Sequence, residues 1–444
     1  MHSHIVVAGR ALSISVAALA LAACPPPVEP PPDDVDCGPE PTGDGTEHGG
    51  SVDADETWGA DGSPHLLPYD TAIYATLTLD TCAVVKIAAG HFLTVRGGAL
   101  VGKPGARIVA RDAEPFAAIG LVGGTMDLEG VVIEGGGDPL NTLPYLAGTL
   151  DLTGAAGPAT QAVARLVDVE VRDSASNGIV VRDGGGFTDD SRDLVVTGAA
   201  QFPVSIWARA VGTLPTGTYT GNATDEILLP ALAGNEAIVE STTMHARGVP
   251  YLVGHETSLG DLRVQAVDGV ATLTIEAGVT LRFKRGAVLH VEQATSTDDP
   301  ARGALIARGT EDAPIVFTSA EASPAPGDWL GIWYGLAPSA TNVIDYARVE
   351  YAGGASVSGS DSCVDPPEVV NDAAIRVRGP VAASFVTNTT IANSASNGID
   401  RGFRSDTKPS FLPSNSFSGV AKCTETYPRD VSGACPDPVP CPTE

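Results

Sequence analysis

The sequence predicts an all-β chain built from internal repeats, and three observations support this fold class. Short segments such as Arg165–Val171 and Leu262–Val267 alternate apolar and polar residues with the period typical of half-buried strands. The 51 glycines and 34 prolines interrupt any helix of ordinary length. Similar segments also recur in the same order in both halves of the chain, which is typical of a repeat architecture.

The recurring segments are separated by an interval that only grows along the chain. The matched positions are Pro64 with Pro250 (186 residues apart), Gly90 with Gly278 (188), Ala110 with Ala307 (197), Gly136 with Gly353 (217), and Ser174–Ile179 with Ser394–Ile399 (220). A duplicated array with loop insertions in its second copy has this property, whereas chance matches would scatter. The sequence therefore predicts an internal duplication.

Short strands joined by Gly, Asn and Asp turns fit a β-sandwich, a propeller or a parallel β-helix. A sandwich of this length would need several domains, yet the one clear linker lies at residues 25–50. A propeller would repeat a blade signature about every 40–50 residues, and the sequence shows none.

The stretch GALIARGTEDAPIVFTSAEASPAPGDWLGIWYG (Gly303–Gly335), followed by ARVEYAGG (Ala347–Gly354), resembles the motif of bacterial right-handed parallel β-helix proteins. LTIEAGVTLRF (Leu273–Phe283) is similar to the stretch that precedes that motif in the family. The resemblance covers about residues 60–420 and is faint in the first half. It implies an all-β, right-handed parallel β-helix solenoid of the pectate-lyase-like type, with three short strands per rung and roughly 15 rungs.

The six residues SASNGI occur twice, at Ser174–Ile179 and Ser394–Ile399. We interpret them as a corner between two strands, because Asn177 tolerates and Gly178 favours the left-handed backbone of a sharp turn. Ile179 and Ile399 are expected to point inward and stack on aliphatic neighbours from adjacent rungs. A shared active-site loop is the alternative interpretation.

The N-terminus carries an apolar run of 13 residues, Ala11–Ala23, which suits a signal peptide and is too short for the roughly 20 residues of a membrane span. Its end, LAAC, resembles the lipobox of bacterial lipoproteins. This resemblance implies removal of residues 1–23 and lipidation of Cys24; an ordinary secretory signal is the alternative. The following Pro-rich, acidic stretch Pro25–Asp36 fits an extended tether.

These patterns predict five segments along the chain. They are a lipoprotein signal peptide (1–23), a lipidated Pro-rich acidic tether (24–56), a first β-helix copy (57–240), a second copy (241–420) and a Cys- and Pro-rich tail (421–444). The lipid on Cys24 makes the membrane a partner and places the protein in the bacterial cell envelope, at the outer membrane or the cell surface. A net charge of −28 argues against a nucleic-acid partner.

Six further cysteines predict disulfides, since an even number in an oxidising compartment favours pairing. The sequence leaves their connectivity open and places none of them in a CxxC spacing, so we expect no metal site from them. These disulfide candidates are Cys37, Cys82, Cys363, Cys423, Cys435 and Cys441.

The sequence contains no GxSxG, HExxH, P-loop or EF-hand motif. Its best enzymatic candidate is the loop Gly186–Asp193, since a polysaccharide lyase needs carboxylates for Ca²⁺ and a base for the sugar proton. The charged residues of this loop are Asp189, Asp190, Arg192 and Asp193. A surface turn with a weak ion pair is the simpler interpretation, because the counterpart Gly402–Pro409 keeps two of the four charges.

Trp329, Trp333 and Tyr334 form the densest aromatic cluster and are candidates for stacking on a sugar. The resemblance implies instead that they belong to the framework of a rung.

An acidic loop and two histidines are weaker candidates for a functional site. The acidic loop Asp361–Glu368 is a candidate for a weak divalent-cation site. His65 and His91 are expected to pack in the interior, because their counterparts in the second copy are aromatic or aliphatic.

We therefore expect a non-enzymatic, lipid-anchored β-helix that binds an extracellular glycan or an envelope protein, or serves as a stalk. No catalytic residue, metal or cofactor is expected. The alternative is a Ca²⁺-dependent polysaccharide lyase or another carbohydrate-active β-helix enzyme. Acids from adjacent rungs that converge with Arg or Lys would favour the enzyme, and scattered charge would favour the rod.

Overall fold

The computed structural model describes residues 35–141, 143, 146–154, 161–232, 237–255, 260–292, 301–356, 362–363, 372–437, 439 and 441–443. The chain divides into two compact units, residues 1–35 and residues 36–444, and all the named strands belong to the second. The predicted signal peptide, Cys24 and the predicted tether up to residue 34 lie outside the described residues.

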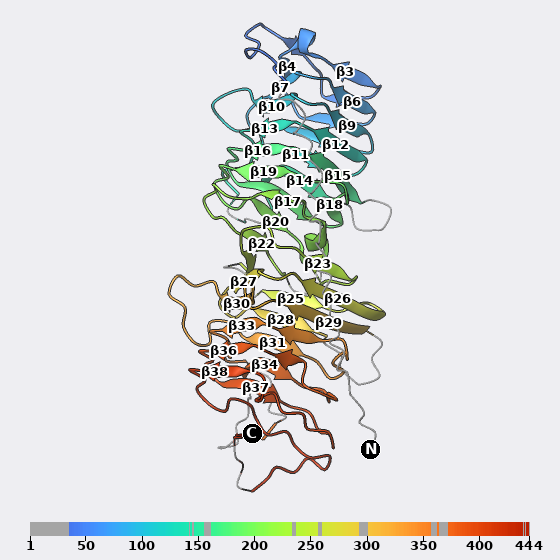
Figure 1. Ribbon diagram of the computed structural model, residues 1–444. Helices are drawn as coiled ribbons and strands as arrows, with labels where there is room; N and C mark the ends of the chain where they lie inside the picture. The colour runs from blue at the N-terminus through green and yellow to red at the C-terminus, as the bar shows by residue number, and fades with distance from the viewer. Residues whose placement is uncertain are drawn as a thin grey trace, which may run out of the picture. The chain divides into compact units, whose positions relative to one another are not determined.

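One parallel sheet of 14 strands runs through the whole second unit (Figure 1). Successive strands of this sheet are separated by one turn of the chain, which takes 21 residues between the register partners Ser51 and Ala72 and 42 residues between Arg348 and Thr390. The roughly 15 rungs expected from the resemblance thus correspond to 14 strands. They are β2 (Ser51–Val52), β5 (Thr71–Ile73), β8 (Phe92–Val95), β11 (Ala118–Leu121), β14 (Gly148–Thr153), β17 (Asn177–Arg182), β20 (Val204–Ile206), β22 (Ile227–Leu229), β24 (Tyr251–Val253), β27 (Thr280–Phe283), β30 (Ile315–Ser319), β33 (Ala347–Glu350), β36 (Thr390–Ala392) and β38 (Ser416–Ser418).

Two further parallel sheets complete the rungs of the first half. The eight-stranded sheet contains β1 (Thr46–Glu47), β4 (His65–Leu67), β7 (Val84–Ile87), β10 (Arg107–Ala110), β13 (Val132–Glu134), β16 (Glu170–Arg172), β19 (Leu194–Thr197) and β21 (Gly217–Thr218). The six-stranded sheet contains β3 (Glu56–Trp58), β6 (Thr76–Leu79), β9 (Ala99–Gly102), β12 (Thr125–Glu129), β15 (Ala162–Val167) and β18 (Gly185–Phe187).

Two five-stranded parallel sheets replace them in the second half. One contains β23 (Thr242–Met244), β26 (Gly269–Ile275), β29 (Ala301–Arg308), β32 (Val343–Asp345) and β35 (Val386–Thr387). The other, which we call the β25 sheet, contains β25 (Asp261–Val264), β28 (Val288–Val291), β31 (Gly331–Tyr334), β34 (Ala373–Val377) and β37 (Asn397–Arg401). The helices of the described residues are two 3-10 helices, Ala60–Gly62 and Ala208–Thr213, and none of the described helices is long and apolar enough to cross a membrane.

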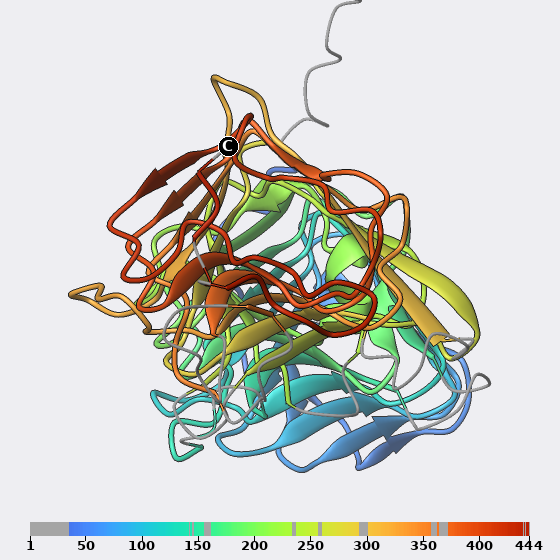
Figure 2. The same cartoon turned by 90° about the horizontal axis from the view of Figure 1, so that it is seen from below.

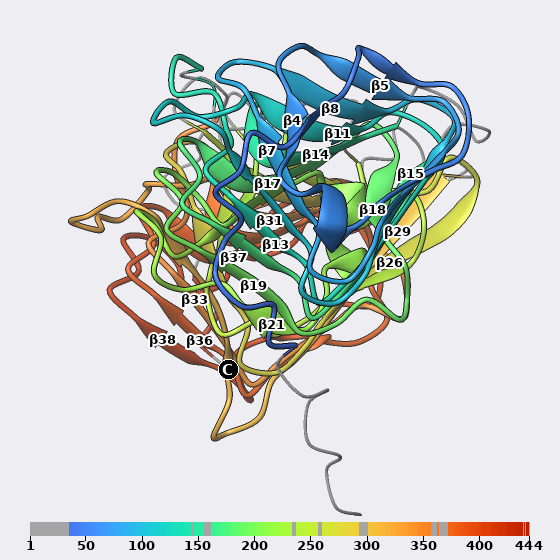
Figure 3. The ribbon, with the colours of Figure 1, turned by 90° about the horizontal axis from the view of Figure 1, so that it is seen from above.

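The predicted all-β parallel β-helix is confirmed by this topology. Seen along the stack from either end, the strands of successive rungs lie over one another (Figures 2 and 3). In Figure 3, β33, β36 and β38 lie on a different side of the stack from β5, β8 and β11, although all six belong to the 14-stranded sheet. The sheet therefore twists along its length, as parallel strands do.

Aliphatic stacks fill the interior. Leu93, Ile119, Leu150, Ile179 and Val204 are register partners in consecutive strands of the 14-stranded sheet, and each is completely buried. Burying a side chain of this size stabilises the fold by about 1.5–3 kcal/mol. Strands such as β6 and β27 bury alternate residues in such stacks, so the apolar alternation seen in the sequence builds this core.

The corner interpretation of SASNGI is confirmed, but its backbone explanation is wrong. Asn177 and Gly178 begin strand β17, and the positive φ falls before the motif, at Asp173 (53°) and Asn393 (54°). Gly178 is required for space, because a Cβ there would lie 2.2 Å from Val196 Cγ1.

Both copies of the corner use the same hydrogen bonds between rungs. The Asn177 Nδ2 donates to Ala147 O (2.7 Å) in the preceding rung, and its Oδ1 accepts from the Phe202 N–H (3.2 Å) in the following one. Asn397 repeats this, donating to a carbonyl at 3.0 Å and accepting an N–H at 3.2 Å. Both asparagines are completely buried, so each amide joins three rungs through groups that solvent cannot satisfy.

The two copies of the corner join different pairs of sheets. The first leads from β16 in the eight-stranded sheet to β17 in the 14-stranded sheet, and the second leads from β36 in the 14-stranded sheet to β37 in the β25 sheet. The match around Gly90 and Gly278 leads into the 14-stranded sheet in both copies, through β8 and β27. The match of Pro64 with Pro250 does not keep its sheet, since it leads into β4 of the eight-stranded sheet and into β24 of the 14-stranded sheet. The recurring motif thus specifies a local strand–corner–strand geometry that serves more than one side of a rung.

All six disulfide candidates are paired. The bonds are Cys37–Cys82, Cys363–Cys435 and Cys423–Cys441. The first fixes the segment before β1 to the early rungs, and the other two fix the C-terminal residues to the last rungs.

Candidate functional site

The loop singled out in the sequence contributes one residue to a charged cluster between rungs. Arg165 on β15 contacts Asp190 through Nε (2.7 Å), and through Nη1 it contacts Asp127 (2.7 Å) and Glu129 (3.3 Å) on β12. Three carboxylates from two rungs therefore converge on the guanidinium of the rung between them. We call Asp127, Glu129, Arg165 and Asp190 the Arg165 cluster.

The other charged residues of that loop stay outside the cluster. Asp189 is exposed, and Arg192 faces the neighbouring Asp193 at 3.8 Å while donating to the backbone oxygen of Asp190 (3.1 Å). Arg165, the centre of the cluster, was missed because its acidic partners are 25 to 38 residues away in sequence. The sequence did contain a signal for this cluster. Arg165 occupies an outward-facing position of its strand, and Asp127 and Glu129 occupy outward-facing positions of the strand one rung before it.

The guanidinium of Arg165 occupies the point on which the three carboxylates of the cluster converge. The hydrogen bonds that Arg165 donates to Asp127 and Asp190 raise the pKa of its guanidinium further above the usual range, the opposite of what a proton-abstracting base requires. The Thr188 hydroxyl and Arg165 lower the pKa of Asp190, which keeps it ionised. Among the described residues, no group of three or more His, Cys, Asp or Glu side chains is placed to hold a metal ion.

The aromatic cluster divides between interior and surface. Trp329 is completely buried, stacks on Phe283 with centroids 4.1 Å apart, and donates its Nε1–H to Glu350 O (2.8 Å). Tyr334 is also completely buried, and burial raises the pKa of its hydroxyl. Both rings therefore have the framework role that the resemblance implies, and only Trp333 reaches the outer surface.

Trp333 belongs to a row of polar and aromatic side chains on the outer face of the β25 sheet. His290 and Arg376 are its register partners on either side. His290 meets the indole edge-on with centroids 5.2 Å apart, and the Arg376 guanidinium lies 5.5 Å from the ring centroid. His290 Nδ1 contacts Asp261 at 2.6 Å, so the row is a continuous chain of contacts from β25 to β34. The tryptophan faces neighbours in the protein on two sides.

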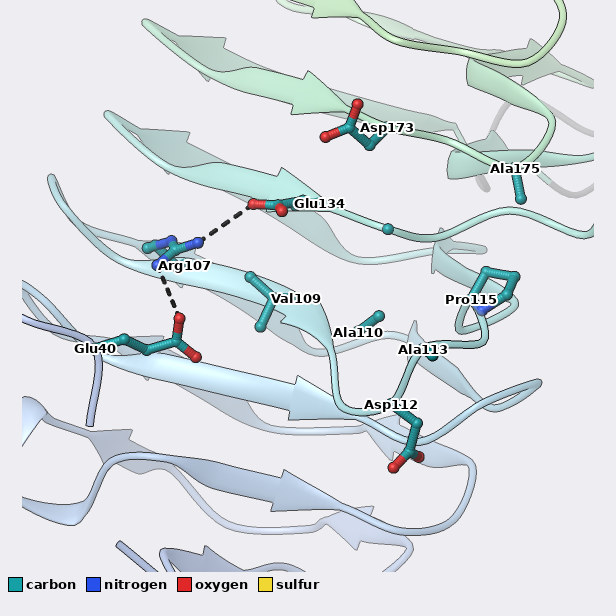
Figure 4. Close-up of a pocket in the computed structure, with 11 residues that line it drawn as sticks. Glu40, Arg107, Val109, Ala110, Asp112, Ala113, Pro115, Glu134, Asp173 and Ala175 are labelled. Atoms are coloured by element: carbon teal, nitrogen blue, oxygen red, sulfur yellow. Dashed lines mark hydrogen bonds and ion pairs between the residues drawn. The ribbon is translucent and has the colours of Figure 1, made fainter. Parts of the chain in front are cut away.

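A groove of about 400 Å³ lies on the outer face of the eight-stranded sheet (Figure 4). Arg107 lies between Glu40 (3.5 Å) and Glu134 (3.2 Å), as Figure 4 shows. Glu40 also contacts Lys86 at 2.6 Å, and Glu134 also contacts Arg172 at 2.8 Å. The charges along this groove thus alternate in sign.

The ion pairs hold the charges of this groove in place. The Lys86 hydrogen bond is the largest cause that lowers the pKa of Glu40, and Glu134 raises the pKa of Arg172. Glu40 comes from the segment fixed by the Cys37–Cys82 disulfide, so this segment covers part of the sheet. The arrangement ties neighbouring rungs together and keeps Glu40 ionised.

The remaining sequence candidates are placed as follows. His65 is buried, as expected, and accepts a hydrogen bond from His48, with the two ring nitrogens 2.9 Å apart. The His91 side chain is 37% exposed rather than packed inside, and its Nδ1 contacts Asp70 at 2.9 Å. Of the acidic loop 361–368, the structure describes Ser362 and Cys363, and the rest of that candidate site lies outside the described residues.

A protein-family model described as a pectate-lyase like beta helix domain matches residues 261–342 of the chain. This chain is a parallel β-helix repeat protein. The matched residues include β25 to β31, with Asp261, His290 and Trp333, and they do not include Arg376, Arg165 or Asp190. No curated protein and no solved structure matches the chain.

Proposed function

We propose that this protein is a lipid-anchored β-helix of a bacterial envelope that binds a glycan or protein ligand, or serves as a stalk, without catalysing a reaction. The observation that carries the non-enzymatic part is the Arg165 cluster. Acids from adjacent rungs do converge there with a basic residue, which was the arrangement expected of an enzyme. Their lone pairs, however, are directed at Arg165 itself, and these contacts raise the pKa of the one base in the cluster.

A Ca²⁺-dependent lyase needs a different geometry. Calcium takes about six to eight oxygen ligands around one point, and the sugar proton needs a base within about 3 Å that can give up its own proton. In the Arg165 cluster a guanidinium lies where the cation would bind. The side chains of the Arg165 cluster are between 28% and 58% exposed, so solvent screens their ion pairs and these contribute little to stability. We therefore assign these ion pairs the role of fixing the orientation of neighbouring rungs.

The same convergence supports the lyase as a second candidate, and one experiment separates the two. Purified mature protein is incubated with polygalacturonate or alginate and Ca²⁺, and unsaturated product is followed in the ultraviolet. We expect no product. Product that disappears in the Asp190→Ala variant would overturn the proposal in favour of the lyase.

The anchored part rests on the LAAC sequence, on Cys24 and on the proline tether that follows. Acyl chains contribute about 0.8 kcal/mol for each buried CH₂, so two or three chains on Cys24 would hold the protein at the membrane. Its test is cell fractionation of the Cys24→Ser variant. We expect the protein to leave the membrane pellet, and an unchanged distribution would contradict the anchor.

A further inference from the structure

We infer that a second groove, on the outer face of the 14-stranded sheet, binds a neutral oligosaccharide. This inference rests on the proposed ligand-binding role and names its ligand. The groove has a volume of about 400 Å³ and spans β5, β8, β11 and β14. We call it the Phe92 groove.

The floor of the Phe92 groove is a column of outward-facing residues. Ala72, Thr94, Gly120 and Asp151 are register partners in four consecutive strands. At a strand spacing of about 4.8 Å, the column is about 14 Å long and runs across the rungs. Its first three members are small, so the floor is recessed between larger side chains. The length and direction suit a short extended chain.

The apolar wall of the groove is exposed. Phe92 is 45% exposed and Val122 is 39% exposed, and both line the groove. An exposed aromatic ring beside polar groups is a surface on which the C–H face of a pyranose can pack, because the ring face carries negative charge and the C–H groups are weakly positive. Binding would therefore remove from water an apolar surface that the fold leaves uncovered.

The polar rim offers both acceptors and a donor. Asp70 Oδ1 accepts the Phe92 N–H (3.1 Å) and contacts His91 Nδ1 (2.9 Å), which fixes this carboxylate beside the aromatic ring. Asp151 Oδ2 accepts a hydrogen bond from Arg182 (3.0 Å). Each carboxylate has further lone pairs that can accept hydrogen bonds from sugar hydroxyls.

The donor is Arg96, which also lines the groove. Its side chain is exposed, and among the described residues it takes part in no ion pair or side-chain hydrogen bond. A guanidinium has five N–H donors in a planar fork, which matches two neighbouring hydroxyl oxygens of a sugar.

The charge of the rim favours a neutral ligand over an acidic one. Two carboxylates, Asp70 and Asp151, flank the groove, against the one lining guanidinium of Arg96. The chain also has a net charge of −28, which repels a polyanion at long range. Hydroxyl groups can satisfy all three charged side chains without adding charge, whereas successive uronate carboxylates would meet acids. The ligand class is thus an uncharged chain of pyranose units.

The test is calorimetric titration of the mature chain with cellohexaose, laminarihexaose, mannohexaose and hexagalacturonate. We expect at least one neutral sugar to bind and hexagalacturonate to bind more weakly. Phe92→Ala should weaken the neutral sugar about tenfold or more, as loss of an aromatic anchor does. Gly120→Leu should also abolish binding by filling the floor. Val270→Ala, at a 50% exposed position on β26, is the control and should bind as the wild type does. Circular dichroism verifies that each variant is folded.

Binding of none of the neutral sugars, or unchanged binding in Phe92→Ala and Gly120→Leu, would overturn the inference. Tighter binding of hexagalacturonate would show that the ligand class is wrong. These outcomes are separate from the proposed function: lyase product in the ultraviolet assay contradicts the non-enzymatic role, whatever binds in the groove. A protein that neither cleaves nor binds sugar contradicts only this inference.

Discussion

Replacing Asn177 with alanine removes an amide that connects three rungs. The side chain is completely buried, donates to Ala147 O at 2.7 Å and accepts the Phe202 N–H at 3.2 Å. The substitution leaves the Phe202 N–H without its partner, while Ala147 O keeps only the backbone N–H of residue 177 (3.4 Å). A buried unsatisfied group costs about 1–3 kcal/mol and the loss of a second hydrogen bond about 0.5–1.5 kcal/mol, so the free energy of unfolding should fall by about 2–4 kcal/mol.

Urea unfolding of Asn177→Ala measures the total loss, and amide hydrogen exchange locates it. We expect faster exchange at Phe202, while amides of the last rungs keep wild-type protection, because a solenoid loses stability locally. Thr57→Ala, at an exposed strand position, is the control and should change stability by less than about 0.5 kcal/mol. If the free energy of unfolding of Asn177→Ala lies within about 0.5 kcal/mol of the wild-type value, the hydrogen bonds of Asn177 between rungs do not stabilise the solenoid.

Three further predictions concern the ends of the solenoid. Burial lowers the pKa of both His48 and His65, so the unfolded chain binds more protons than the folded one below about pH 6.5. The stability that depends on the neutral His48–His65 pair is therefore present above that pH and is lost as the pH falls through the pKa values of the folded protein. On acidification, the unfolding temperature of the His48→Gln variant should fall less than that of the wild type. Replacing Cys37 and Cys82 together with serine opens a loop closed over a sequence separation of 45 residues, and urea unfolding should show a loss of about 2–4 kcal/mol. Gly398→Ala places a Cβ 2.3 Å from a backbone oxygen and should destabilise the last rungs by about 1–3 kcal/mol, measured as faster exchange of their amides.

Local patterns in the sequence predicted most of the fold. Alternation in Leu262–Val267 places a strand where β25 lies, because inward residues must be apolar whatever the neighbouring rung contains. Arg165–Val171 is instead divided between the end of β15 and β16, with a corner at Asp168 (φ 53°) that the alternation does not show. The same rule applies to the aromatic residues. Ile332 and Tyr334 share one parity and are both buried, so alternation alone could have separated Tyr334 from Trp333.

The contacts between rungs could not be predicted in the same way. One turn of the solenoid takes between 19 and 43 residues, so sequence distance does not say which residues are register partners. Arg165 and its three acids, and the column from Ala72 to Asp151, exist only through that register. The backbone of the SASNGI corner was also mispredicted, because the space limit at Gly178 comes from a neighbouring rung.

The most direct test of the account is to recover sugar from the protein and weigh it. The mature chain is incubated with the neutral hexasaccharides and Ca²⁺, separated from free sugar by gel filtration, and denatured, and the released sugar is analysed by mass spectrometry. We expect an intact hexasaccharide in the protein fraction of the wild type and much less in Phe92→Ala. Shortened or unsaturated products, or no sugar in the protein fraction, would contradict a protein that binds glycan without cleaving it.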